Sequence, residues 1–94
     1  MASEFQDGKE RDDKIVDSLA SEKRYAILRH LLSRRMTASE LSRVLDLPKS
    51  TVHDNLIKLI KINLVRREYG WRRWVYYELT AMGRQVLQSL PDKP

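Results

Sequence analysis

The side chains of this 94-residue chain that are best suited to binding chemistry are basic, and they gather in two short stretches. One stretch reads KSTVHDNLIK over residues 49–58, and the other reads YGWRRW over residues 69–74. Lysine, arginine and small hydroxyl side chains bind phosphate oxygens, and tryptophan beside arginine adds flat apolar surface to the same contact. Both stretches therefore favour a polyanionic ligand.

Catalytic chemistry has little support in the same residues. His53 and Asp54 are neighbours in sequence, so on a helix their side chains diverge around its axis and do not converge on a nucleophile. The chain has no cysteine, which excludes disulfides, thiolate metal sites and cysteine nucleophiles, and its other histidine, His30, lies far from His53. The sequence also shows no second residue placed for general acid–base catalysis with the glutamates Glu40, Glu68 and Glu78. We therefore expect no enzyme activity, no metal and no cofactor.

Length and charge narrow the class of protein further. A chain of 94 residues has room for one domain with a modest core, which argues against a two-domain enzyme. Residues 1–22 hold seven acidic and three basic residues, giving −4, whereas residues 23–94 hold six acidic and fifteen basic residues, giving +9. A small domain with such a basic excess is typical of nucleic-acid binding, although membrane surfaces and acidic proteins also attract basic domains.

The sequence predicts neither a membrane span nor a signal peptide. No stretch approaches the roughly 18 apolar residues that a membrane span needs. The N-terminal MASEFQDGKERDD is acidic and polar, whereas a signal peptide is basic and then apolar. We expect an intracellular, cytoplasmic protein without a membrane partner, located in the host cytoplasm if the chain is viral.

The N-terminal third is expected to contain a tail followed by helix. Residues 1–11 lack apolar periodicity and are predicted to form a flexible acidic tail. From Asp12 the pattern becomes helical, and Ser21 can cap a second segment whose apolar positions include Ile27 and Leu31. One bent helix would satisfy the same pattern.

Two short helices are predicted next. Thr37 and Glu40 form a capping box, which starts a helix with apolar positions Leu41, Val44 and Leu45. Residues 46–48 interrupt it, because proline disfavours helical geometry at the preceding residue and suits a helix start. The following helix, over about residues 49–61, has an apolar face formed by Val52, Leu56, Leu59 and Ile60.

The apolar period then changes to two, which predicts strands over residues 64–69 and 74–79 with Gly70 in the turn region. Val75, Tyr77 and Leu79 alternate with polar and aromatic residues, so one face of the second strand can cover the core. A last helix is predicted from Thr80 to before Pro91. Its apolar residues are Met82, Val86, Leu87 and Leu90.

In this order the segments resemble a winged helix-turn-helix domain of the ArsR/MarR type, found in small transcriptional regulators of bacteria, archaea and archaeal viruses. The resemblance covers roughly residues 19–90, through LASEKRYAILRHLL, TASELSRVLDLPKSTVHDNLIKL, NLVRRE and YYELTAMGRQVL. It implies a mainly α fold with a small β-hairpin wing (α+β), in a domain over residues 12–91 whose terminal helices dimerise. ArsR-type metal sensors commonly use cysteine-containing sites, so the chain departs from them and metal sensing is not expected.

The resemblance also implies which surface contacts DNA. The helix at about 49–61 would be the recognition helix in the major groove, and the wing at 69–74 would lie on the flanking minor groove or backbone. The expected DNA-binding residues are Lys49, Ser50, Thr51, His53, Asp54, Lys58, Trp71, Arg72 and Arg73. Asp54 can accept from cytosine N4, but relatives often carry a polar or basic residue there, so no base preference can be transferred.

Each of these residues also has an interpretation without DNA. Ser50 or Thr51 can simply cap the helix, and His53 and Asp54 can be solvated. Trp71 and Trp74 can pair across the strands and cover the base of the wing, and for Trp74 we favour such packing. The arginines that we weight toward structural or solvated roles are Arg34, Arg35 and Arg43. Weaker candidates for DNA contact are Arg66 and Arg67, because strand alternation sends them to opposite faces.

The leading hypothesis is a homodimeric, sequence-specific transcriptional regulator, acting as a repressor on palindromic double-stranded DNA, without an evident small-molecule effector. Such a dimer would place two recognition helices about one DNA turn apart. The alternative is a winged-helix interaction module that docks Trp71 and the basic face on an acidic protein. Binding to random duplex at low salt separates the two.

Overall fold

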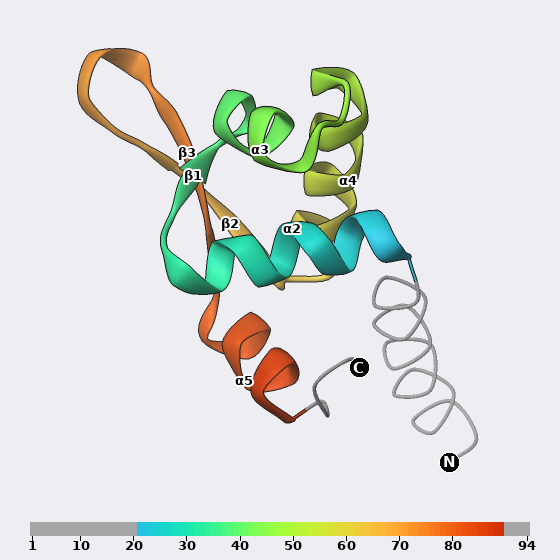
Figure 1. The fold of residues 1–94 in the computed structure, drawn as a ribbon. Helices are drawn as coiled ribbons and strands as arrows, with labels where there is room; N and C mark the ends of the chain where they lie inside the picture. Colours follow the sequence, from blue (N-terminus) through green and yellow to red (C-terminus); the bar gives the residue numbers. More distant parts are fainter. Residues whose placement is uncertain (1–20, 90–94) are drawn as a thin grey trace.

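The computed structural model describes residues 21–89. The tail predicted over residues 1–11, the helical segment predicted from Asp12 and the residues from Leu90 onward lie outside this range. The described elements are α2 (Glu22–Ser33), β1 (Met36–Thr37), α3 (Ala38–Leu45), α4 (Lys49–Lys61), β2 (Val65–Tyr69), the 3-10 turn η1 (Trp71–Arg73), β3 (Val75–Leu79) and α5 (Ala81–Ser89). In Figure 1 the tip of the β2 and β3 hairpin stands clear of the helices, and α5 lies at the opposite end of the molecule.

Helices α2 and α3 begin where polar side chains cap their first turns. The Ser21 hydroxyl accepts a hydrogen bond from the Arg24 amide at 3.4 Å, and the extended backbone of Ser21 supports a separate start for α2. The Thr37 hydroxyl accepts from the Glu40 amide at 3.1 Å, while the Thr37 amide donates to Glu40 Oε1 at 3.0 Å. Both predicted helix starts, including the capping box, are confirmed.

The turn between α3 and α4 is held by its own hydrogen bonds. Asp46 adopts left-handed backbone, with φ of 53°, at the end of α3. The Leu47 amide donates to the Ser42 carbonyl at 3.1 Å, and the Ser42 hydroxyl donates to the Leu47 carbonyl at 2.6 Å. Pro48 then precedes α4, as its fixed φ allows. This turn fixes the start of α4 beside α3.

The strands form one antiparallel sheet in the order β1-β3-β2. The predicted hairpin is confirmed as β2 and β3, each starting one residue later than expected, with Tyr69 opposite Val75. The sequence did not indicate the third strand, β1, which pairs Met36 with Tyr77 along the other edge of β3. A strand of two residues has no periodicity of its own, and pairing with a distant segment defines it.

The apolar faces of the helices and the sheet meet in one core. Its fully buried side chains are Ile27, Leu28, Leu31, Leu41, Val52, Leu56, Leu59, Leu64 and Val65. The predicted inner face of α4 is confirmed, and β3 buries Tyr77 and Leu79 as expected. Val44 is an exception among the expected apolar positions, since it lies exposed on α3.

Helix α5 is joined closely to the start of β2. The Thr80 hydroxyl accepts from the Gly83 amide at 2.9 Å and donates to the Asn63 carbonyl at 2.7 Å, while the Thr80 amide donates to the Leu64 carbonyl at 3.1 Å. A Cβ at Gly83 would lie 2.2 Å from the Leu64 carbonyl oxygen. Glycine at this position therefore permits the close approach of α5 to the backbone before β2.

Candidate nucleic-acid interface

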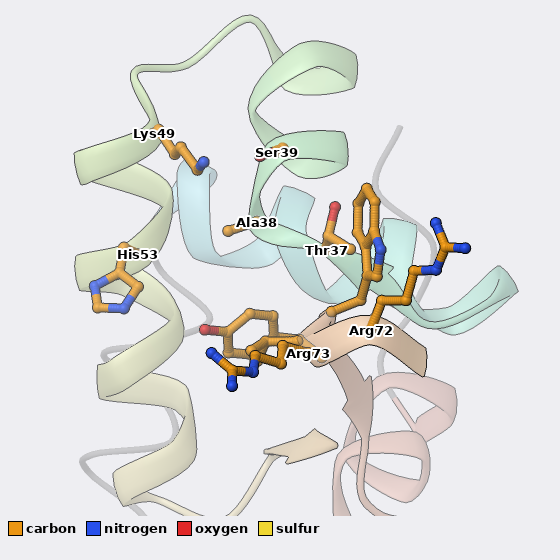
Figure 2. A pocket seen from close by; sticks show the side chains of 10 residues that line it. Thr37, Ala38, Ser39, Lys49, His53, Arg72 and Arg73 are labelled. Carbon is orange, nitrogen blue, oxygen red and sulfur yellow. The ribbon is translucent and has the colours of Figure 1, made fainter. Parts of the chain in front are cut away.

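An open groove of about 570 Å³ lies between the start of α4 and the wing, which is the β2 and β3 hairpin with its connecting turn at residues 69–75. The groove residues come from α4, from the start of α3 and from the wing, and Figure 2 shows them from close by. They are Thr37, Ala38, Ser39, Lys49, His53, Arg72, Arg73, Trp74, Val75 and Tyr77. The fold thus joins the two basic stretches of the sequence in one concave surface.

Helix α4 contributes the first wall of the groove. Lys49 and His53 are four residues apart, so they share one exposed face of the helix and both line the groove. Of the other α4 residues expected to bind DNA, Ser50, Asp54 and Lys58 are exposed outside the groove lining and Thr51 is half-buried. In the part of the chain that the structure describes, α4 has no side-chain cap, so neither hydroxyl residue acts as one.

The uncapped start of α4 differs chemically from the starts of α2 and α3. Ser21 and Thr37 satisfy first-turn amides in those two helices, whereas Pro48 precedes α4 and offers no hydrogen-bonding side chain. First-turn amides without a protein acceptor can donate to an external anion, and the helix dipole favours negative charge there. Lys49 adds its own charge at the same end.

The wing contributes the second wall through a strained turn. The Trp74 amide donates to the Trp71 carbonyl at 3.2 Å, which closes a turn with Arg72 and Arg73 at its two central positions. Both arginines have positive φ, 56° and 64°, as in a type I′ turn, where asparagine and glycine are preferred. In Figure 2 Arg73 points toward α4 and His53, whereas Arg72 points away from α4.

Large aromatic side chains on the wing are unusually exposed. Trp71 is 79% exposed, Tyr69 72% and Trp74 53%. The expectation that Trp74 covers the base of the wing is wrong, because both tryptophans belong to the turn and Trp74 lines the groove. Trp71 is not among the groove residues and lies at the tip.

Three arginines outside the groove form ion pairs with glutamates. Arg34 contacts Glu40 at 2.9 Å, and Arg35 contacts Glu68 at 3.5 Å while its guanidinium lies 4.4 Å from the centre of the Tyr76 ring. Arg66 pairs with Glu78 and, at 3.8 Å, with Glu68. These ion pairs give Arg34, Arg35 and Arg66 partners within the described chain.

The cations around the groove have no such compensation. Among the described residues, no ion pair within 4.0 Å involves Lys49, Lys58, Arg72 or Arg73. All four side chains are exposed. The positive charge of these residues is therefore available to a ligand.

Two pKa shifts describe the electrostatics near the groove. Hydrogen bonding from the Thr37 backbone, helped by the Arg34 guanidinium, lowers the pKa of Glu40, so this carboxylate stays ionised beside the start of α3. Hydrogen bonding to Tyr77 and then to Tyr69 raises the pKa of Arg67. Arg67 is thus held among tyrosines on β2, with its guanidinium 5.9 Å from the centre of the Tyr77 ring.

Sequence reasoning missed Asn55 as a residue that positions the interface. Asn55 is only 8% exposed; its Oδ1 accepts from Arg24 Nη1 at 3.2 Å, and its Nδ2 donates to the Thr51 carbonyl at 2.9 Å. It therefore links α4 to α2 within the apolar face of α4. The available signal was its spacing of three residues from Val52, which places it on that face.

Comparison with known proteins gives a family. A family model described as a helix-turn-helix domain matches residues 19–68, more than half of the chain. The chain belongs to this helix-turn-helix family. The family and the fold are those of DNA-binding transcription regulators, which are not enzymes, and the wing and sheet agree with the winged ArsR/MarR type. A search of curated proteins returned no match.

Solved structures show the same fold over most of the chain. HlyU from Vibrio cholerae N16961 is 25% identical, with a TM-score of 0.74 over 85% of this chain and 86% of that one. NolR from Sinorhizobium fredii is 23% identical, with a TM-score of 0.80 over 94% and 87%. The transcriptional repressor BigR from Xylella fastidiosa is 16% identical, with a TM-score of 0.75 over 96% and 92%.

Within residues 21–89, no group of three or more histidine, cysteine or acidic side chains is arranged to hold a metal ion. None of the helices in this range combines the length and the hydropathy needed to cross a membrane.

Proposed function

We propose that the chain is a homodimeric, sequence-specific transcriptional repressor that binds palindromic double-stranded DNA through this groove. The observation that carries the proposal is the arrangement of uncompensated cations: Lys49 on α4 and Arg72 and Arg73 on the wing surround one open groove without ion-pair partners among the described residues. Duplex DNA presents closely spaced phosphates to such a surface.

In this proposal, α4 enters the major groove and the wing lies on the flanking minor groove or backbone. Lys49, Ser50 and Thr51 bind phosphate together with the first-turn amides of α4, and Lys58 binds phosphate further along the helix. His53 and Asp54, both exposed, reach base edges. Arg72 and Arg73 contact the minor groove, where a narrow width strengthens the negative potential.

Arg67 is a further candidate that the structure brings forward. It is exposed on the same strand face as Val65 and Tyr69, and its cross-strand partner Tyr77 lines the groove. Its guanidinium is held by the two tyrosines rather than by a carboxylate in the described chain. It can therefore add a phosphate contact beside the wing arginines.

The dimer and the repressor role belong to the same proposal. Met82 and Val86 on α5 are only half-buried, so apolar surface remains for contact with a second copy. The helix predicted from Asp12 would join α5 in this dimer interface, in a domain over residues 12–91. A two-fold dimer reads a palindrome, with half-sites about 34 Å apart. BigR, a protein of the same fold, is a transcriptional repressor, which favours repression here.

The second candidate function is docking on an acidic protein. The observation that favours it is Trp71, 79% exposed beside two arginines that form no ion pair within residues 21–89, since exposed tryptophan and arginine are common binding anchors. Gel shift with a random duplex at low salt separates the two functions. Retardation at micromolar protein is expected for the repressor, and its absence would favour the interaction module.

A footprint on the DNA upstream of the protein's own gene tests the finer claims. Two protected half-sites one helical turn apart are expected from a dimer. Protection of one half-site only would argue against the palindrome and the dimer while leaving DNA binding intact.

A further inference from the structure

The tip of the wing exposes more aromatic surface than folding of the hairpin requires. Tyr69, Trp71 and Trp74 fall within six residues, and more than half of each side chain is exposed. A buried aromatic side chain commonly removes ~150–250 Å² from water, so leaving three exposed forgoes much hydrophobic stabilisation. The surface is therefore better explained by a ligand than by the stability of the wing.

The turn separates the two tryptophans into different positions. Trp74 lines the groove beside the start of α3, whereas Trp71 is outside the groove lining and is the most exposed of the three. The left-handed backbone at Arg72 and Arg73 fixes the reversal between them. The turn that carries Trp71 connects β2 and β3, and the tip of this hairpin stands clear of the helices in Figure 1, so Trp71 is accessible to a ligand.

Charge selects the chemical class of this ligand. Arg72 and Arg73, directly beside Trp71, have no ion-pair partner among the described residues, so the ligand must combine negative charge with a flat apolar surface. Nucleic acid supplies both phosphates and aromatic bases, whereas an acidic peptide supplies charge without stacked rings. Apolar side chains are known to wedge between base pairs from the minor groove.

We propose that Trp71 is a wedge that stacks on a base and partly opens one base step in the DNA held by the wing. The inference rests on the proposed DNA binding and adds a local deformation of the duplex to it. Arg72 and Arg73 hold the phosphates or the groove on either side, while Trp71 replaces a base as the stacking partner. A duplex already weakened at that step is bound more tightly, because less unstacking is required.

The test compares a random-sequence duplex with the same duplex carrying a central mismatch, using the full chain. We expect the wild-type protein to prefer the mismatched duplex by about 10-fold, within the range that one stacked base provides. W71A should bring the two affinities within about twofold of each other, and W71F should keep most of the preference. The double variant R72A/R73A is the matched control, which should weaken binding to both duplexes while preserving their ratio.

A spectroscopic readout separates stacking from simple proximity. The chain has two tryptophans, so W74F leaves Trp71 as the only indole. On binding a duplex with 2-aminopurine beside the mismatch, Trp71 emission should be quenched and the 2-aminopurine emission should rise. Thermal unfolding of each variant checks that the exposed substitutions leave the fold intact.

The possible failures are distinguishable. If neither duplex is bound at low salt, the proposed DNA binding itself is wrong and the wedge with it. If both duplexes are bound with the expected salt dependence but W71A keeps the mismatch preference, only the wedge is overturned. A blue shift of Trp71 emission with phosphatidylserine vesicles, without quenching by DNA, would also overturn it and indicate a lipid surface.

Discussion

Arg72 and Arg73 occupy backbone positions that their side chains do not favour. A left-handed backbone costs a residue other than glycine roughly 1–2 kcal/mol, and two consecutive arginines adopt it here. Strain of this kind often marks a functional site, since a sequence selected for stability alone would place asparagine and glycine in the turn. The two side chains are exposed and without carboxylate partners in the described chain, so their contribution to folding is small.

Replacing the pair by the preferred turn sequence should separate stability from binding. For R72N/R73G we expect the free energy of unfolding to rise by about 1–2 kcal/mol, because the strain is relieved, and DNA affinity to fall. Chemical denaturation and fluorescence anisotropy measure the two effects. R72K/R73K is the control that keeps both the charge and the backbone strain. A stable R72N/R73G variant with undiminished affinity would show that the two arginines do not contact DNA.

Thr37 and Glu40 are the residues that fix the start of α3 and hence the floor of the groove. T37A removes the hydroxyl of the capping box, and we expect a loss of about 1–2 kcal/mol in the free energy of unfolding at neutral pH. Since Thr37 is also buried, the loss should be at the upper part of the usual range for caps. Urea denaturation of the variant beside S39A, a half-buried serine on the same helix turn that serves as the control, measures it.

The lowered pKa of Glu40 predicts an acid-dependent share of this stability. Because the folded-state pKa lies below the ordinary value, the ionised carboxylate stabilises the fold above about pH 4.3, and this share is lost as the pH falls through the folded-state pKa. E40Q keeps an acceptor for the Thr37 amide but does not titrate. The stability difference between wild type and E40Q should therefore shrink on acidification, and a difference independent of pH would contradict this assignment.

At the scale of elements, the patterns that are local in sequence were the ones that could be predicted. The capping box of α3 and the inner face of α4 depend on neighbours three and four residues away, so the sequence showed them directly. Strand β1 and the buried Asn55 depend on partners in distant segments, Tyr77 and Arg24, and no local pattern indicates such partners.

The candidate site was predictable in outline for the same reason. The basic stretches at residues 49–58 and 69–74 were visible in the sequence, but their union in one groove depends on the tertiary arrangement. The position of Trp74 was misjudged because Trp71 and Trp74 were expected to pair across two strands, whereas both belong to a turn with positive φ at Arg72 and Arg73. The contacts proposed for each side chain remain predictions.

Helix α5 tests the packing of one element against another. G83A should lower the free energy of unfolding by about 1–3 kcal/mol, because its Cβ would lie 2.2 Å from the Leu64 carbonyl oxygen and α5 would have to move. Alanine is otherwise the better helix former, so propensity alone predicts the opposite sign. Q88A, at an exposed position of the same helix, is the control. A G83A variant as stable as Q88A would show that α5 can move away from Leu64 with little loss in the free energy of unfolding.

At the scale of the whole molecule, charge is divided between structural and available groups. Arg34, Arg35 and Arg66 are engaged with glutamates of the sheet and of α3, whereas the cations of α4 and the wing surround the groove without such partners. A basic excess of this distribution attracts DNA at long range and positions it against one face. Phosphate contacts should therefore dominate the affinity for DNA.

The dominance of phosphate contacts is measured by the salt dependence of the affinity for duplex DNA. Fluorescence anisotropy with a random duplex should give a linear fall of log affinity with log salt, at a slope of about −0.9 for each phosphate neutralised. R72A/R73A should make the slope less negative by the amount expected for up to about two phosphates. R34A, at an arginine paired with Glu40, should leave the slope unchanged. Binding that does not change with salt, or a slope indifferent to the loss of both wing arginines, would contradict the account.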